Sequence, residues 1–188
     1  SIAASNNNTN FSQLATGLSP GVTYYVCSLA TNSTGSAVGN VASFTTPLPP
    51  TVTTTAATTV TDTTAQLNGS GIGNGAFTSG WFRYAATDPG TCDDVFGSRA
   101  PTSGSQSVGS AYTANSFSQA ISGLSPGTTY YYCAIVSSTE WTSFGSVLTL
   151  RTQGPPSATT LTPTVSSISA TLRLSANPNG ATSIVWFR

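Results

Sequence analysis

The sequence predicts an all-β chain built from tandem β-sandwich repeats, and three observations support this fold class. Strand-length segments rich in threonine and aromatic residues alternate with turn residues along the 188-residue chain. A segment of 14 residues occurs twice at domain-sized spacing. Proline-rich boundaries lie at residues 47–50 and 153–156, where proline favours extended backbone and stiffens a linker.

The duplicated segment is predicted to be a tight turn that leads into a strand. It covers residues 123–136, and its other copy covers residues 17–30, an offset of 106 positions. Proline presets φ at the second turn position, and glycine tolerates the positive φ that follows. The aromatic and β-branched residues after the turn suit a pleated, half-buried surface.

This segment also carries a family resemblance. The run Leu124-Ser-Pro-Gly-Thr-Thr-Tyr130-Tyr-Tyr132 resembles the corner between strands E and F of fibronectin type III domains. It is most similar to the tandem repeats of bacterial surface and secreted proteins, and the resemblance covers nearly the whole chain. It implies a β-sandwich in which Leu124 fills the core and Tyr130, like Tyr24 in the other copy, forms a tyrosine corner. The usual strand-B tryptophan of the family is absent. The RGD tripeptide is also absent, so integrin-type adhesion does not carry over.

Residues 51–153 are predicted to form one complete fibronectin type III-like repeat. Alternation along strand F places Tyr130, Tyr132, Ala134 and Val136 in the core and Cys133 on the outer face. Strand B is expected to direct Ala65 and Leu67 inward. The predicted strands A, B, C, E, F and G cover residues 51–56, 64–70, 80–84, 117–121, 130–136 and 147–152.

The two ends are predicted to be incomplete repeats. Residues 1–47 match the second half of a repeat, with strands E, F and G at 11–15, 24–31 and 41–45. Residues 157–188 match the first half, because Trp186-Phe187-Arg188 repeats Trp81-Phe82-Arg83. A half-sandwich exposes an apolar face and open strand edges, which is unfavourable. Two interpretations remain open: a window cut from a longer array, or a subunit whose last half pairs with the first half of the next copy.

The three cysteines bear on the cellular compartment. In the implied topology strand C lies beside strand F, and Cys92 follows strand C, so a Cys92–Cys133 disulfide is predicted. The alternative is a pair of free, half-buried thiols. Cys27 is expected to have its partner outside this chain segment. A disulfide indicates an oxidising, extracellular or cell-surface location.

The composition excludes several partners. Charged residues make up 5% of the chain, against about 25% in ordinary soluble domains, and the net charge is zero. Such a hydroxyl-rich surface has no long-range field to attract nucleic acid or an anionic membrane. No apolar run reaches the roughly 18 residues of a membrane span, so no membrane insertion is expected. Near-zero net charge favours self-association.

The sequence offers no catalytic constellation. Ser19 and Ser125 lie in G-x-S-x-G matches, but histidine is absent and a proline follows each serine, which favours a turn over a nucleophile elbow. The single glutamate, Glu140, stands apart from other carboxylates, so no acid–base pair is expected. The chain is therefore predicted to be non-enzymatic and to need no cofactor.

Two weaker candidate sites remain. Asp88, Asp93 and Asp94 form a weak calcium candidate, although their spacing fits no established loop and favours solvated turn residues. An aromatic strip is expected from Trp81 and Arg83, facing outward beside Tyr131, with Trp141 as a second contact. Such a strip could stack on sugar rings or on a neighbouring subunit, and the alternative is cross-strand pairing that covers the disulfide.

Together these features lead to two functional hypotheses. The first is a structural repeat of an extracellular bacterial fibre, sheath or surface appendage, assembled head to tail or laterally from copies of itself. The alternative is a spacer or a carbohydrate-binding, adhesive module of a larger secreted protein, with glycans as partners.

Overall fold

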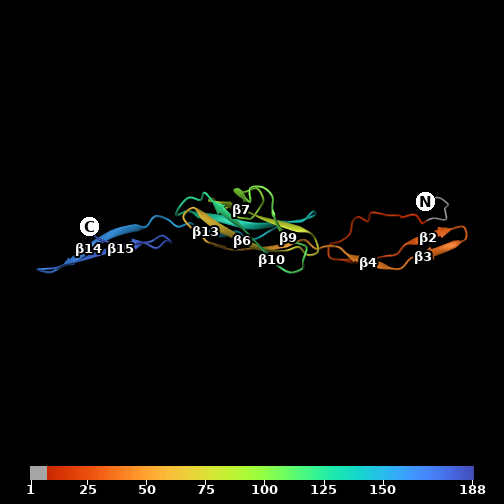
Figure 1. Ribbon diagram of the computed structural model, residues 1–188, viewed down its shortest axis with the longest axis horizontal. Coiled ribbons are helices and arrows are strands. Elements are labelled where there is room, and N and C mark those ends of the chain that lie inside the picture. The colour runs from red at the N-terminus through yellow and green to blue at the C-terminus, as the bar shows by residue number, and fades with distance from the viewer. Residues whose placement is uncertain (1–7) are drawn as a thin grey trace. The chain divides into compact units, whose positions relative to one another are not determined.

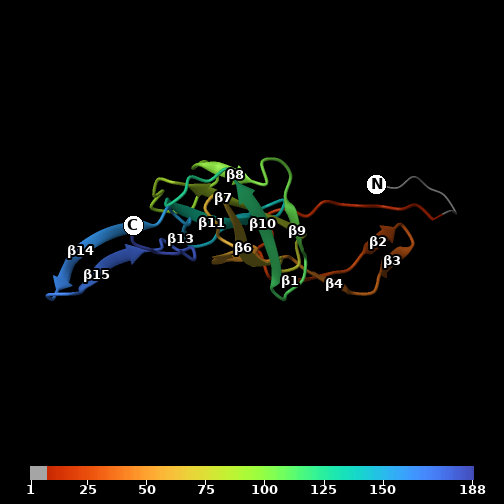
Figure 2. The ribbon, with the colours of Figure 1, turned by 60° about the vertical axis from the view of Figure 1, so that its left-hand side comes forward.

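The computed structural model describes residues 8–188, which contain β-strands and no helix (Figures 1 and 2). The chain divides into two compact units, Ser1–Leu48 and Pro49–Arg188. This division falls within the proline-rich segment 47–50. The finer division into one complete and two partial repeats remains a prediction, and the part of the first segment before Asn8 lies outside the described residues.

The second unit begins with a β-sandwich of two sheets, which confirms the all-β fold class. One sheet has the order β10-β6-β5, and the other has β7 and β11 at its centre. In the second sheet β12 and β13 pair with β11, while β8 and β9 pair with β7. The strands are β5 (Thr51–Thr58), β6 (Thr64–Ile72), β7 (Thr78–Ala85), β8 (Ser98–Ala100), β9 (Gln106–Gly109), β10 (Asn115–Ser122), β11 (Thr129–Ser137), β12 (Thr142–Phe144) and β13 (Leu148–Arg151).

The core of this sandwich lies between the two sheets and follows strand alternation. Leu67 on β6 and Tyr132 on β11 are fully buried there, and the Phe82 and Phe117 rings lie 5.0 Å apart, centroid to centroid. The side chains predicted to face inward from β6 and β11 do so: Ala65, Leu67, Tyr130, Tyr132, Ala134 and Val136. Because the side-chain period of a strand is two, Cys133 and Ile135 lie on the opposite face.

The duplicated turn has the same geometry in both units. The Ser125 N–H donates to Tyr130 Oη at 2.9 Å, and the Ser19 N–H donates to Tyr24 Oη at 2.9 Å. The turn glycines take positive φ in each copy, 74° at both Gly17 and Gly123. The local sequence therefore determines this corner without help from the rest of a repeat.

The first unit consists of two short ladders. Strand β1 (Thr23–Val26) pairs with β4 (Ala42–Thr45), and β2 (Leu29–Asn32) pairs with β3 (Gly35–Val38). The prediction of a strand at residues 11–15 is wrong, and the predicted strand at 24–31 is interrupted at residues 27–28. Both differences have one cause, because the strands that pair with these positions in the sandwich, β6 and β7, have no counterpart in this unit.

The second unit ends in a hairpin of β14 (Ser157–Val165) and β15 (Ala170–Asn177). Residues 182–188, which match the start of β7, form no strand. Their expected partner is a counterpart of β11, and residues 157–188 contain none. A β-strand needs a neighbour for its backbone hydrogen bonds, so this segment stays irregular.

Candidate functional site

Two surfaces of the molecule are candidate sites. The clamped face is the outer side of β7 and β11, with Trp81, Cys133 and Ile135, where Cys92 and Phe96 pack against this small cluster. The open faces are the exposed apolar surfaces of residues 8–48 and of residues 157–188. The clamped face contains the disulfide and the Arg83–Asp94 ion pair, and the open faces contain most of the exposed aromatic and aliphatic side chains of the described residues.

A disulfide holds the clamped face together. Cys92 and Cys133 are bonded, with their Cα atoms 6.0 Å apart and a sequence separation of 41. Cys133 is fully buried on β11, so the bond ties the segment after β7 to the centre of the sheet. Cys27, the counterpart of Cys133 in the first unit, is free and exposed.

A polar cluster anchors the segment that follows β7. Trp81 Nε1 donates to Asp94 Oδ1 at 2.7 Å, and Arg83 Nε donates to the same oxygen at 2.8 Å. The Arg99 guanidinium carbon lies 4.7 Å from the Trp81 ring centroid, within cation–π range. Trp81 is consequently only 8% exposed. It faces outward as predicted, but its ring is occupied by neighbours from its own chain.

The four residues proposed as an aromatic strip are only partly brought together. Trp81 and Arg83 share Asp94, whereas the register of β7 and β11 places Trp81 opposite Ile135 and Tyr131 opposite Ala85. Trp141 lies in the turn between β11 and β12, beyond the other end of β11 from Tyr131. Tyr131 and Trp141 are both half-buried. Binding of a sugar or a subunit by these four residues remains a prediction.

The three acidic residues of the calcium candidate serve as hydrogen-bond acceptors. Asp88 Oδ1 accepts from the Gly90 N–H, and Asp93 Oδ1 accepts from the N–H groups of Val95 and Phe96. The two bonds from the Val95 and Phe96 N–H groups, with a smaller contribution from Arg83, hold the pKa of Asp93 below its usual value. Across the residues that the structure describes, no group of three or more His, Cys, Asp or Glu side chains is arranged to hold a metal ion.

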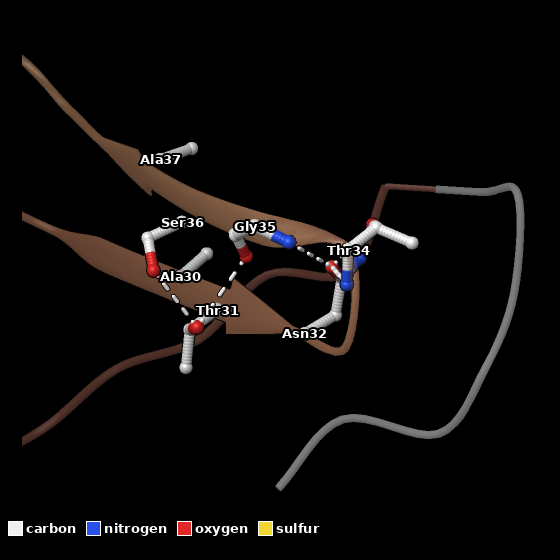
Figure 3. Close-up of a pocket in the computed structure, with 7 residues that line it drawn as sticks. All are labelled: Ala30, Thr31, Asn32, Thr34, Gly35, Ser36 and Ala37. Carbon is white, nitrogen blue, oxygen red and sulfur yellow. Dashed lines mark hydrogen bonds between the residues drawn. The ribbon is translucent and has the colours of Figure 1, made fainter.

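The hairpin of β2 and β3 contains a shallow pocket (Figure 3). Asn32 Oδ1 accepts from the N–H groups of Thr34 and Gly35 at 2.9 and 3.1 Å, and Thr31 and Ser36 share a hydroxyl hydrogen bond. The lining is alanine, threonine, asparagine, glycine and serine, so it offers no general acid, general base or charge. The matching hairpin of the sandwich, formed by β11 and β12, instead contacts the segment before β5, because Ser143 Oγ donates to the carbonyl of the buried Pro50 at 2.6 Å.

The open faces are the candidate surfaces that the sequence predicted most directly. Large apolar side chains are exposed at both ends of the chain, and some of them match core residues of the sandwich, as Phe11 matches Phe117 and Leu172 matches Leu67. They include Phe11, Leu14, Leu29, Val38, Val41 and Phe44 before residue 48, and Ile168, Leu172, Ile184, Val185, Trp186 and Phe187 after residue 157. The sequence signal that identified them is the internal repeat.

Comparisons with known proteins give only distant likenesses. No family model matches the chain, and no curated protein matches it. The chain is similar to the sensor domain of the anti-sigma factor RsgI4 of Pseudobacteroides cellulosolvens, with 21% identity over 57% of this chain and 98% of that domain, at a TM-score of 0.39. It is also similar to the FN1–FN3 domains of chicken CNTN1, with 12% identity over 72% of this chain and 43% of that structure, at a TM-score of 0.35. These likenesses are too distant to assign a family or a function.

Proposed function

We propose that this chain is a non-enzymatic structural element of an extracellular assembly, such as a fibre, sheath or surface appendage, and that it associates with copies of itself. The observation that carries the proposal is the pair of open faces. Apolar side chains as large as Phe11 and Trp186 are exposed on them in a chain that has almost no charge to keep copies apart.

The disulfide supports the extracellular location. Cys92 and Cys133 are joined on the outer face of the sheet that contains β7 and β11, and such bonds persist in oxidising compartments. In the range 8–188 no helix is long and apolar enough to cross a membrane. A sandwich clamped by a disulfide and linked through proline-rich segments suits a mechanical role.

Self-association is tested by measuring the mass of the oxidised, purified chain over a wide concentration range. Multi-angle light scattering is expected to give a weight-average mass that rises with concentration well above the monomer mass of 19.0 kDa, and electron microscopy is expected to show elongated particles. A stable, dispersed monomer at all concentrations would contradict the proposal and would favour the spacer or glycan-binding alternative.

A further inference from the structure

The two half-repeats keep the strand registers of the complete sandwich. Tyr24 pairs with Phe44 in β1–β4, as Tyr130 pairs with Leu150 in β11–β13. In the hairpin at the other end, Thr160 pairs with Leu174, as Thr54 pairs with Gly69 in β5–β6. Each half therefore has the backbone arrangement that it would need inside a whole sandwich.

Each half also lacks the ladders that join the first half of the complete sandwich to its second half. In the complete sandwich β10 pairs with β6, and β11 pairs with β7, and these two ladders join its first half to its second. The counterparts of β6 and β7 lie within residues 157–188, and those of β10 and β11 lie within residues 8–48. The edge that each half leaves unpaired is the edge that the other half would pair with.

Burial of matching residues follows the same division. Phe117 is 5% exposed and its counterpart Phe11 is 78% exposed, while Leu67 is fully buried and its counterpart Leu172 is 54% exposed. In the sandwich, the Phe117 ring packs against Phe82, which belongs to the opposite half. The open faces are therefore the two sides of one divided core.

Two core positions of the sandwich have side chains of a different size in the half-repeats. A Cβ on Gly69 would lie 2.9 Å from the Ala134 Cβ, so this position of the complete sandwich has no room for a side chain. On β11 the large Tyr132 spans the core, and its Oη donates to the Thr55 carbonyl at 2.9 Å. In the half-repeats Leu174 replaces the glycine and Val26 replaces the tyrosine, so one core position gains volume and another loses volume.

In one cross-strand pair, the larger and the smaller residue exchange places between the sandwich and the half-repeats. Val136 lies opposite Gly80 in the β11–β7 ladder of the complete sandwich. Their counterparts in the half-repeats are Ala30 and Val185, so the larger residue changes sides.

We propose that residues 157–188 of one copy of this chain bind residues 8–48 of a second copy, and that the two halves complete a β-sandwich between them. Residues 9–16 become a strand beside β15, and residues 184–188 become a strand beside residues 27–31. Because the two contacting surfaces differ, the contact repeats from copy to copy and generates a linear head-to-tail array. This inference rests on the proposed self-association and names the surface responsible for it.

A cysteine substitution tests the predicted register. Cys133 lies opposite Arg83 in the β11–β7 ladder, so the free Cys27 of one copy should lie opposite residue 188 of the next. Under mild oxidation Arg188→Cys is expected to give a ladder of disulfide-linked multimers on non-reducing gels, at least about tenfold stronger than wild type. Ser175→Cys, on β15 away from this pair, is the matched control. Equal crosslinking by the control, or a crosslink within single chains only, would overturn the inference.

Two charge substitutions test the divided core itself. Phe11→Asp and Leu172→Arg place a charge at positions that are exposed in the separate halves and become buried in the joint, so each should weaken association by roughly a hundredfold or more. The controls, Ser12→Asp and Thr171→Arg, put the same charges on adjacent residues that match the outward positions Ser118 and Gln66, and should associate like wild type.

Mixing these variants separates the inference from the function on which it rests. Each blocked variant retains one intact half, so an equimolar mixture of Phe11→Asp and Leu172→Arg chains should form a discrete heterodimer by sedimentation velocity and no longer array. If wild type assembles and both variants assemble equally well, the divided-core inference is wrong while self-association stands. If wild type stays monomeric, the proposed function itself is wrong.

Discussion

The sandwich formed by β5 to β13 and the two end segments, residues 8–48 and 157–188, contain similar sequences but have different neighbours. The tyrosine corner, the turn glycines and the ladders between neighbouring strands are the same in both. The strands at 11–15 and 182–188 form only where a partner strand is present, as their counterparts in the sandwich show. Turns and hairpins are thus determined locally in this chain, and the central strands depend on residues far away in sequence.

The largest expected effect is a difference in the free energy of unfolding between the same substitution made at two matching positions. Phe117→Ala removes a ring that packs against Phe82 in the core and should lower the free energy of unfolding of the complete sandwich by roughly 3–5 kcal/mol. Phe11→Ala should change it by less than about 0.5 kcal/mol, because Phe11 is exposed and belongs to the other unit. Denaturant titration of both variants, followed by tyrosine and tryptophan fluorescence, measures the difference.

Equal destabilisation by the two substitutions would contradict this account. It would mean that Phe11 already contributes to the core of the complete sandwich, and that the open face of residues 8–48 is covered within the same chain. The comparison is therefore made at low protein concentration, where association between copies contributes least.

The sequence was sufficient for the main strands and their inward faces. Alternation identified the core residues of β6 and β11, and the internal repeat identified the exposed apolar segments at both ends. The disulfide was predicted from the family resemblance and is present. Each of these features depends on a local period or on a repeat that can be read directly along the chain.

The remaining features depend on tertiary contacts that have no local pattern. Strands β8, β9 and β12 lie in polar, serine- and glycine-rich segments, and pairing with β7 or β11 determines them. The interruption at residues 27–28 has the same origin. In the sandwich β7 bridges the gap between the β13 and β12 pairings of β11, and the first unit has no such strand. The Trp81–Asp94–Arg83 cluster joins residues through a loop whose conformation the sequence did not indicate.

The next prediction compares the loss of stability on removing the bonded Cys133 with that on removing its free counterpart Cys27. The double substitution Cys92→Ala and Cys133→Ala opens a loop of 41 residues and should lower the free energy of unfolding by about 3–4 kcal/mol. Cys27→Ala should leave the stability of the complete sandwich unchanged, because Cys27 is exposed and lies in the other unit. Thermal and denaturant unfolding of the oxidised proteins checks both. A similar loss in the two variants would show that Cys27 takes part in a bond in solution.

The smallest expected effect is a dependence of stability on pH. The complete sandwich and the two ends of the chain differ in their content of acidic residues. All five acidic residues lie in the complete sandwich, and the half-repeats contain none. Backbone N–H groups of Val95 and Phe96, assisted by Arg83, lower the folded-state pKa of Asp93 below 3.8. A lowered folded-state pKa stabilises the fold fully above the usual aspartate range, and this stabilisation is lost as the pH falls through the folded value. The melting temperature of wild type should therefore fall with acid below about pH 4.

Asp93→Asn should make that fall shallower, because an amide oxygen can still accept both N–H bonds but does not titrate. Asp62→Asn, which removes an exposed carboxylate that accepts no backbone N–H bond, is the matched control and should keep the wild-type slope. Melting temperatures measured from pH 2 to pH 7 at fixed ionic strength compare the three proteins, over roughly the range in which aspartate titrates. Parallel curves for wild type and Asp93→Asn would show that the Asp93 turn does not contribute to acid sensitivity. In that case the clamped face would derive its stability from the disulfide and the Asp94 cluster alone.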